Sequence, residues 1–188
     1  MVDAAIQTVI AAVVLLPIVA FGQMKSDEPI KTTVCEIVKS PALFNGKIIT
    51  VRAPIEIAFE SFGLSASRCA EQKIDDVALE YGSGPRKQPT IWCCGDMVPR
   101  DPLVLVQNKD FRRFHHYLTA EKKAKRCYDC YLYHVTATLT GRFDAVEPQP
   151  GALCGFGHMG AACGRLVIRS VADVVADPVD PTAREKNE

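Results

Sequence analysis

The clearest pattern in the chain is the alternation of apolar and polar residues over positions 49–60, ITVRAPIEIAFE. One face carries the apolar residues Ile49, Val51, Ala53, Ile55, Ile57 and Phe59, and the other carries Thr50, Arg52, Glu56 and Glu60. A period of two predicts a half-buried β-strand. Because Pro54 has no N–H to donate, we expect this strand to bend, to bulge or to lie at a sheet edge near Pro54.

Four further segments predict strands by the same reasoning. DVALEY (76–81) and HVTATLTGRFDAV (134–146) alternate along their length, which is typical of antiparallel strands with one buried face. RLVIRSV (165–171) is a shorter and more apolar strand candidate. FGLSASRC (62–69) is placed to return from the first strand as a hairpin.

The helix signals are few. In 32–40, TTVCEIVKS, the apolar residues fall at helical spacing after a threonine cap, and Ser40-Pro41 begins one further turn that Asn45-Gly46 closes. A longer helix begins after Asn108, with Phe111, Phe114 and Leu118 on one face as core residues. It falls between the third and fourth predicted strands.

This order of elements predicts a mainly β protein, a small OB-like five-stranded Greek-key barrel with one helix between strands 3 and 4 and a short N-terminal helix. Residues 82–107 are longer than such a connection needs, so we interpret them as an insertion in which PLVLV adds an edge strand. The alternatives are a lipocalin-like barrel and an irregular β-sandwich, because five strands and one helix do not fix a topology.

The two ends of the chain differ from the middle. Residues 4–21 are almost entirely apolar and small residues follow at Ala20 and Gly22, which predicts a signal peptide over 1–22. Residues 23–176 then form a single domain, and the polar, proline-containing segment 177–188 is a disordered tail. We expect an exported protein, periplasmic or extracellular, or a membrane-anchored one if the first segment is not cleaved.

The charge of the mature chain argues against two classes of partner. The sequence has 22 basic and 22 acidic residues, and removal of 1–22 takes away only Asp3, which leaves 22 against 21 and a formal charge of +1. A nearly neutral chain has no overall field to gather polyanions. We therefore expect no nucleic-acid partner and no membrane contact after signal removal.

Several motifs together resemble a known group of proteins. They are CEIVKSPALFNGKIITVRAPI (35–55), Cys69, DVALEY, and GFGHMGAACGRLVIRSVADV (155–174). They resemble a group of predicted exported bacterial proteins of unknown function, and the resemblance covers most of the mature chain. It implies an exported domain without an assigned activity and supplies no catalytic residue. Cys154 and Cys163 depart from the pattern of the group, which suggests that they belong to each other.

All eight cysteines follow the predicted signal peptide, and an even number in an exported chain favours disulfides. Sequence alone does not fix their connectivity. The preferred pairing joins Cys35 to Cys69, Cys154 to Cys163, and Cys93 and Cys94 to Cys127 and Cys130. The last four are also a zinc-site alternative, but adjacent Cys93-Cys94 fits metal-ligand spacing poorly, so no metal is expected.

Cys127 and Cys130 form a C-x-x-C pair, the motif of thiol–disulfide enzymes. Here the pair follows a predicted helix, whereas an activated thiol needs a helix N-terminus. His158, among glycines, is interpreted as a hydrogen-bonding residue that holds an irregular loop.

We therefore expect a non-enzymatic binding or structural module, with no catalytic residue and no cofactor. Its ligand, a small molecule, a saccharide or a protein, would meet a surface near Arg52, Glu56, Phe62 and His158, following the usual OB site. The alternative is an exported thiol–disulfide or zinc-binding protein that uses Cys127 and Cys130.

Overall fold

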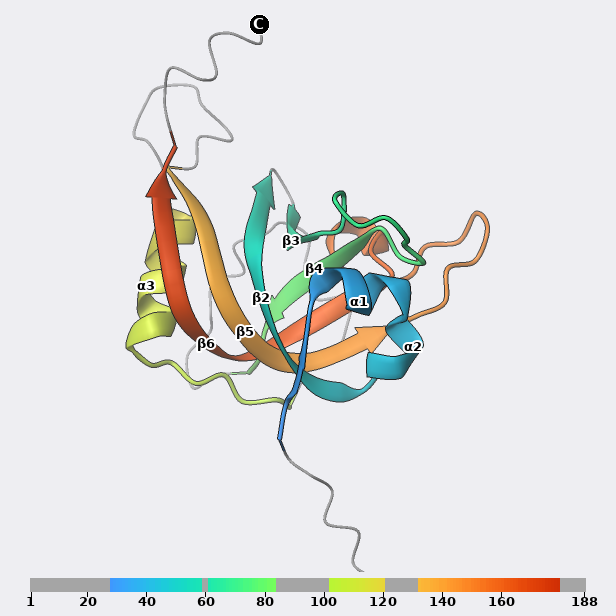
Figure 1. Ribbon diagram of the computed structural model, residues 1–188, viewed down its shortest axis with the longest axis horizontal. Helices are drawn as coiled ribbons and strands as arrows, with labels where there is room; N and C mark the ends of the chain where they lie inside the picture. Colours follow the sequence, from blue (N-terminus) through green and yellow to red (C-terminus); the bar gives the residue numbers. More distant parts are fainter. Residues whose placement is uncertain (1–27, 59–60, 84–101, 121–131, 180–188) are drawn as a thin grey trace, which may run out of the picture.

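Alternating strands close into a five-stranded barrel in the computed structural model, which describes residues 28–58, 61–83, 102–120 and 132–179 (Figure 1). The strands of the barrel are β2 (Lys47–Ala58), β3 (Ser61–Ser65), β4 (Asp76–Tyr81), β5 (Tyr133–Ala145) and β6 (Gly164–Pro178). They pair in the order β2-β3-β4-β6-β5, and a further β5–β2 pairing closes the ring. The prediction of a small, mainly β barrel is confirmed.

The core lies inside this ring because each strand turns every second residue inward. Of the predicted inward residues of β5, Val135 is 2% exposed, Ala137, Leu139 and Phe143 are fully covered, and Ala145 is half-buried. Opposite them in β2, Val51 pairs with Leu139 and Ala53 with Ala137, and both are buried. The predicted alternation is therefore confirmed over positions 49–55 and 135–143. Ile57 is half-buried, and Phe59 lies outside the described residues.

Pro54 lies where β2 has a neighbour on one side only among the described residues. It pairs with Thr136 of β5, while the other edge of β2 pairs with β1 (Ile30–Thr32) at positions 49–51 and with β3 at 56–58. Positions 52–55 thus form a local edge. A residue without an N–H is accommodated there, as predicted.

Two expectations about the strands need correction. β4 was expected to be antiparallel to its neighbours, and it is antiparallel to β3 but parallel to β6. Alternation indicates that one face of a strand is buried, but it does not indicate the direction of the neighbouring strand. β6 is also longer than the predicted 165–171. It reaches Pro178, and Asp177 pairs with His134, so β6 extends two residues into the segment expected to be a disordered tail. Residues 180–188 lie outside the described residues.

The two N-terminal helices form where predicted, but only the first has a side-chain cap, since Ser40 makes no capping hydrogen bond to the second. α1 (Val34–Lys39) has a capping box in which the Thr33 hydroxyl accepts from the Glu36 N–H and the Glu36 carboxylate accepts from the Thr33 N–H. α2 (Pro41–Phe44) begins with proline, and Gly46 follows it with φ +73°. The chain can then reverse into β2 without strain.

The longer helix, α3 (Lys109–Thr119), lies along β6 (Figure 1). The Asn108 side chain accepts from the Phe111 N–H at 2.8 Å and caps it, and Phe111, Phe114 and Leu118 are buried. Of the predicted insertion, the structure describes only the ends. PLVLV forms one isolated bridge, Val104 to Ser83, in place of the expected edge strand.

The predicted signal peptide lies outside the described residues. In the part of the chain that is described, no helix combines the length and the apolar character needed to cross a membrane.

Candidate binding surface

The four residues expected to line a ligand surface occupy different environments. Phe62 is 7% exposed, pairs with Ile57 and packs its ring against that of Tyr81, at a centroid distance of 5.6 Å. It is a core residue. Successive side chains of a strand point to opposite faces, so a shift of one position in β3 separates an inward residue from an outward one. Glu56, in contrast, is exposed and pairs with Gly63. Phe62 is therefore corrected from a surface residue to an interior one.

Arg52 stabilises a bulge on the outside of the barrel. Its Nη1 donates to the carbonyl oxygen of Asp173 at 2.9 Å, and the Oδ2 of Asp173 accepts from the Thr138 hydroxyl at 3.0 Å. Asp173 has φ +49° where β6 contains one more residue than β5. The guanidinium is thus engaged in holding an irregular backbone.

His158 belongs to the connection between β5 and β6, residues 146–163, which we call the disulfide loop. Cys154 and Cys163 are bonded with a Cα separation of 4.7 Å, which confirms the predicted pair. Between them the backbone is hydrogen-bonded to itself, including Gly155 N to Gly160 O at 2.9 Å and Ala162 N to Phe156 O at 2.9 Å. The loop therefore has a defined conformation, held by its own hydrogen bonds and by the disulfide.

The inner side of the disulfide loop packs on β4 and β6. Gly157 has φ +67°, and a Cβ placed on it would lie 3.1 Å from the Cβ of Ala78 in β4. The Phe156 ring lies under the guanidinium of Arg165, 4.8 Å from its centroid. A glycine where the loop touches the strand and a cation–π contact beside it fix the loop to the barrel.

Arg165 is itself held by carboxylates on the neighbouring strands. Its side chain is 7% exposed, and it donates from Nη1 to Glu80 at 3.1 Å and from Nη2 to Asp144 at 2.7 Å. Asp144 also accepts two hydrogen bonds from Arg142, at 2.8 and 2.9 Å. We call Glu80, Arg142, Asp144 and Arg165 the ion-pair network. It lies beneath the disulfide loop and was not predicted from the sequence.

The electrostatics of the network follow from this crowding of opposite charges. Burial alone would raise the pKa of Asp144, but hydrogen bonds from Arg142 and Arg165, together with their charges, outweigh it and hold that pKa below its usual value. Asp144 is therefore ionised at neutral pH. The carboxylates of the network offset the desolvation cost of the buried Arg165 guanidinium.

The outer side of the disulfide loop is apolar and exposed. Leu153 is 71% exposed and Met159 61% exposed, and no Lys, Arg, Asp or Glu occurs between residues 148 and 164. Met159 also has φ +53°, an unusual conformation for a residue with a side chain. His158 lies next to it and is half-buried. The loop thus presents two large apolar side chains from a rigid support.

The second predicted disulfide is also present: Cys35 of α1 bonds Cys69 with a Cα separation of 5.2 Å. The four cysteines at 93, 94, 127 and 130 lie outside the described residues. Among the residues that are described, no group of three or more His, Cys, Asp or Glu side chains is placed to hold a metal ion.

Removal of the loop disulfide is expected to destabilise the protein by about 2.6 kcal/mol in the loop-entropy model, since the bonded cysteines are only nine positions apart. Chemical denaturation of a Cys154→Ser/Cys163→Ser variant measures this. His158→Ala, the matched control in the same loop, should cost no more than about 1 kcal/mol, the value of one hydrogen bond. A larger loss for His158→Ala than for the double variant would contradict the structural interpretation of the loop.

An aromatic cluster lies between β4 and α3. The Tyr81 ring meets Phe111 edge-on at 5.3 Å and His115 at 6.0 Å, and His115 stacks on Phe111 at 5.9 Å. Burial raises the pKa of Tyr81 and lowers that of His115. Tyr81 Oη and His115 Nδ1 are both buried without a hydrogen-bond partner in the described structure. The cluster therefore carries two buried polar atoms that cost stability.

Tyr81→Phe should accordingly leave the free energy of unfolding unchanged or raise it by up to about 1 kcal/mol, because it removes a buried hydroxyl that makes no bond. Thermal denaturation tests this beside Tyr117→Phe, a control that removes the hydroxyl of another half-buried tyrosine. A loss above about 1 kcal/mol for Tyr81→Phe alone would mean that an ordered water satisfies the hydroxyl.

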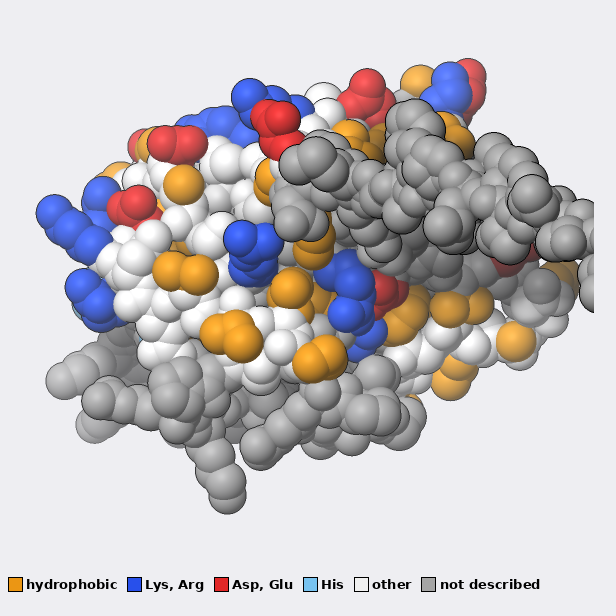
Figure 2. Space-filling view, turned by 90° about the horizontal axis from the view of Figure 1, so that it is seen from below, with side chains coloured by type: hydrophobic (Ala, Val, Ile, Leu, Met, Phe, Trp, Pro, Cys, Tyr) orange, Lys and Arg blue, Asp and Glu red, His pale blue; other side chains and the backbone are white. Residues whose placement is uncertain are grey.

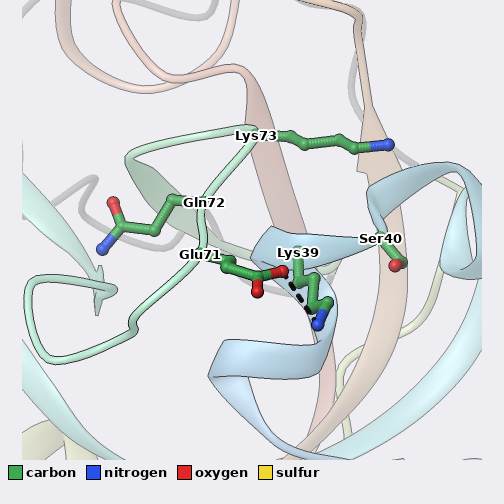
Figure 3. Close-up of a pocket in the computed structure, with 5 residues that line it drawn as sticks. All are labelled: Lys39, Ser40, Glu71, Gln72 and Lys73. Atoms are coloured by element: carbon green, nitrogen blue, oxygen red, sulfur yellow. Dashed lines mark ion pairs between the residues drawn. The ribbon is translucent and has the colours of Figure 1, made fainter.

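A polar hollow of about 220 Å3 lies where α1 ends, lined by Lys39, Ser40, Glu71, Gln72 and Lys73 (Figure 3). Lys39 Nζ and Glu71 Oε2 are 2.8 Å apart across it. None of its residues was expected from the sequence to line a site, because two distant segments form it.

Comparison with known proteins does not extend this description, since no protein-family model, curated protein or solved structure matches the chain.

Proposed function

We propose that the protein is an exported, non-enzymatic binding module whose barrel supports the disulfide loop as its recognition element. The observation that carries the proposal is that the two sides of that loop differ: one is attached to the barrel and the other is exposed and apolar. Its inner side is fixed by the Cys154–Cys163 bond, the Gly157–Ala78 contact and the Arg165–Phe156 contact, while its outer side presents Leu153 and Met159. A rigid loop loses little conformational entropy when it binds.

The strand order supports an OB-type assignment of the barrel. The pairing β2-β3-β4-β6-β5, closed by β2, has its parallel pair between the third and fifth strands of the barrel, and α3 follows the third. In OB-type barrels the loop between strands 4 and 5 contributes to the ligand site. The disulfide loop occupies that position between β5 and β6.

The distribution of apolar side chains supports the same location. On the face shown in Figure 2, hydrophobic side chains lie singly among polar and basic ones. Single exposed apolar residues are normal on a protein surface. Leu153 and Met159 differ because both are more than half exposed within one stretch, 148–164, that has no charged residue and is hydrogen-bonded internally.

Export is supported by the two disulfides, because such bonds persist in oxidising compartments. It also agrees with the apolar segment at residues 4–21 and with the resemblance to exported bacterial proteins of unknown function. A thiol count on protein purified from an oxidising host separates this proposal from the alternative, in which Cys127 and Cys130 give two reactive thiols or one bound zinc.

The binding role is tested by site-specific photo-crosslinking in the organism that produces the protein. A photoreactive phenylalanine replaces Leu153 or Met159, and the matched control carries it at Val175, which is 44% exposed on β6. The proposal expects a discrete adduct from the loop positions and none from Val175. Equal adducts from all three positions, or none from the loop, would overturn it.

A further inference from the structure

The outward side of α3 carries basic side chains. Its exposed residues at 109, 112, 113 and 116 follow the i, i+3, i+4, i+7 spacing that places side chains on one side of a helix. We call them the cationic face: Lys109, Arg112, Arg113 and His116. The buried residues Phe111, Phe114 and Leu118 lie on the opposite side of α3. Figure 2 shows Lys and Arg side chains gathered at the left edge of the molecule, where α3 lies in Figure 1.

The cationic face has no carboxylate partner within the described part of the chain. Arg112 donates from Nη1 to the carbonyl oxygen of Gln107 at 3.1 Å, which leaves its charge unneutralised. Asp110, the acidic residue of α3, is half-buried and forms no ion pair with these side chains. Arg142 and Arg165, in contrast, are both paired with Asp144. The charges of the cationic face are therefore available to an anionic partner.

This arrangement of cations lowers the stability of the helix itself. Lys109 and Arg113 are like charges four residues apart, which repel each other on a helix surface. Lys109 and Arg112 also lie in the first turn, where the positive end of the helix dipole disfavours a cation. Helix stability alone would favour acidic residues there. A departure from local stability is typical of a functional surface.

We infer that the cationic face binds an acidic segment of a partner protein. Charge complementarity sets the sign of the partner, and each guanidinium group can donate two parallel hydrogen bonds to one carboxylate. Seven residues separate Lys109 from His116, which is about 10 Å along the helix axis. Carboxylates on one side of an extended peptide recur about every 7 Å, so the face matches two of them.

An anionic membrane fits this surface less well. A helix that lies in a membrane interface inserts its apolar side chains, whereas those of α3 are buried in the protein. The chain as a whole is nearly neutral and lacks the field that gathers a long polyanion, but a short acidic segment needs only the local charges. The cationic face shares no residue with the disulfide loop, and Figure 1 shows the two on opposite sides of the barrel. Each can therefore fail without the other.

The experiment is a titration of the full chain with a capped hexaglutamate peptide at fixed ionic strength, with hexaglutamine as the uncharged control peptide. Backbone amide shifts of residues 109–119 are followed by NMR. We expect saturable shifts with hexaglutamate, with a dissociation constant on the order of millimolar, and none with hexaglutamine. Raising the ionic strength from about 0.02 to 0.2 M should weaken this binding severalfold, because exposed charges are screened. Equal binding of the two peptides, or no shift at residues 109–119, would overturn the inference.

Substitutions at one arginine sharpen the test. Arg113→Gln should weaken hexaglutamate binding about three- to fivefold, and Arg113→Lys should retain most of it. Arg68→Gln, the matched control, replaces another exposed arginine, between β3 and β4, and should change nothing. Arg113→Gln should also keep or raise the melting temperature, because it removes a like-charge repulsion. Equal losses of binding in Arg113→Gln and Arg68→Gln, or a lower melting temperature for Arg113→Gln, would contradict the assignment.

Two other results would assign the cationic face to a different partner. Shifts at residues 109–119 when the protein alone is concentrated would identify a second copy of the chain. Shifts with phosphatidylglycerol vesicles but not with hexaglutamate would identify a membrane. Either result would overturn the assignment to an acidic protein segment.

Discussion

Leu139→Asp is expected to abolish cooperative unfolding of the barrel. Leu139 is fully buried in β5, where it pairs with Val51 of β2 on one side and Val171 of β6 on the other. Truncation of a buried leucine costs about 2–5 kcal/mol, and a carboxylate in its place adds a desolvation cost. The sum is comparable to the whole stability of a small domain, about 5–15 kcal/mol.

The control for this variant is Thr136→Asp, three residues earlier on the opposite face of β5. Thr136 lies beside Pro54 and Val175 and is half-buried, so its substitution should cost less than about 1 kcal/mol. Far-UV circular dichroism during urea denaturation compares the two. A sigmoidal transition of Leu139→Asp with the parent's midpoint would show that the inward register of β5 is wrong.

The two strands with the best predictions, β2 and β5, are those with one buried face. In β5 the inward residues are buried and the outward threonines at 136, 138 and 140 are half-buried, so the polarity alternates with the exposure. β6 does not behave this way. Leu166, Val167 and Ile168 are all fully buried, and Arg165 is 6% exposed, because the disulfide loop and Arg165's partners cover part of the outer face. Alternation disappears there, although these residues belong to the predicted strand. The part that was missed, residues 172–178, contains the bulge at Asp173.

One of the predicted surface residues, Phe62, was wrong. In FGLSASRC the apolar residues Phe62, Leu64 and Ala66 alternate with smaller or polar ones, and all three are buried. The alternation therefore already indicated that Phe62 faces inward, and its assignment to a surface followed the usual OB site instead. The loop disulfide and Cys35–Cys69 were predicted, because an exported-type sequence restricts how cysteines are used. The ion-pair network and the polar hollow depend on residues from distant segments, and no spacing in the sequence brings Glu80 to Arg165.

Asp144→Asn is expected to destabilise the protein by about 3 kcal/mol at neutral pH. The substitution keeps the shape of the side chain but removes the charge that accepts from Arg142 and Arg165. Arg165 would then remain buried with Glu80 as its carboxylate partner. Removal of one member of a buried pair costs about 3–5 kcal/mol. Glu80 stays paired with Arg165, so the expected loss lies toward the lower value.

Two further variants separate the loss of a charge pair from general disruption. Asp144→Asn/Arg165→Met removes both charges and should recover much of the stability, since apolar groups of similar size replace buried ion pairs at little cost. Glu71→Gln, which breaks the exposed Lys39–Glu71 pair, should leave the free energy of unfolding unchanged. If the double variant is less stable than Asp144→Asn, then Asp144 does not stabilise the protein mainly by neutralising the buried charge of Arg165.

The pH dependence gives this prediction an independent readout. The folded pKa of Asp144 lies below its usual value, about 3.9, so between the two values the unfolded chain binds more protons than the folded one. The contribution of Asp144 is therefore fully present above pH 4 and is lost as the pH falls through the folded pKa. Urea denaturation between pH 7 and pH 2 should show the parent and Asp144→Asn converging in stability only at the acidic end. A constant difference over the whole range would mean that the ionised carboxylate does not stabilise Arg165 beneath the disulfide loop.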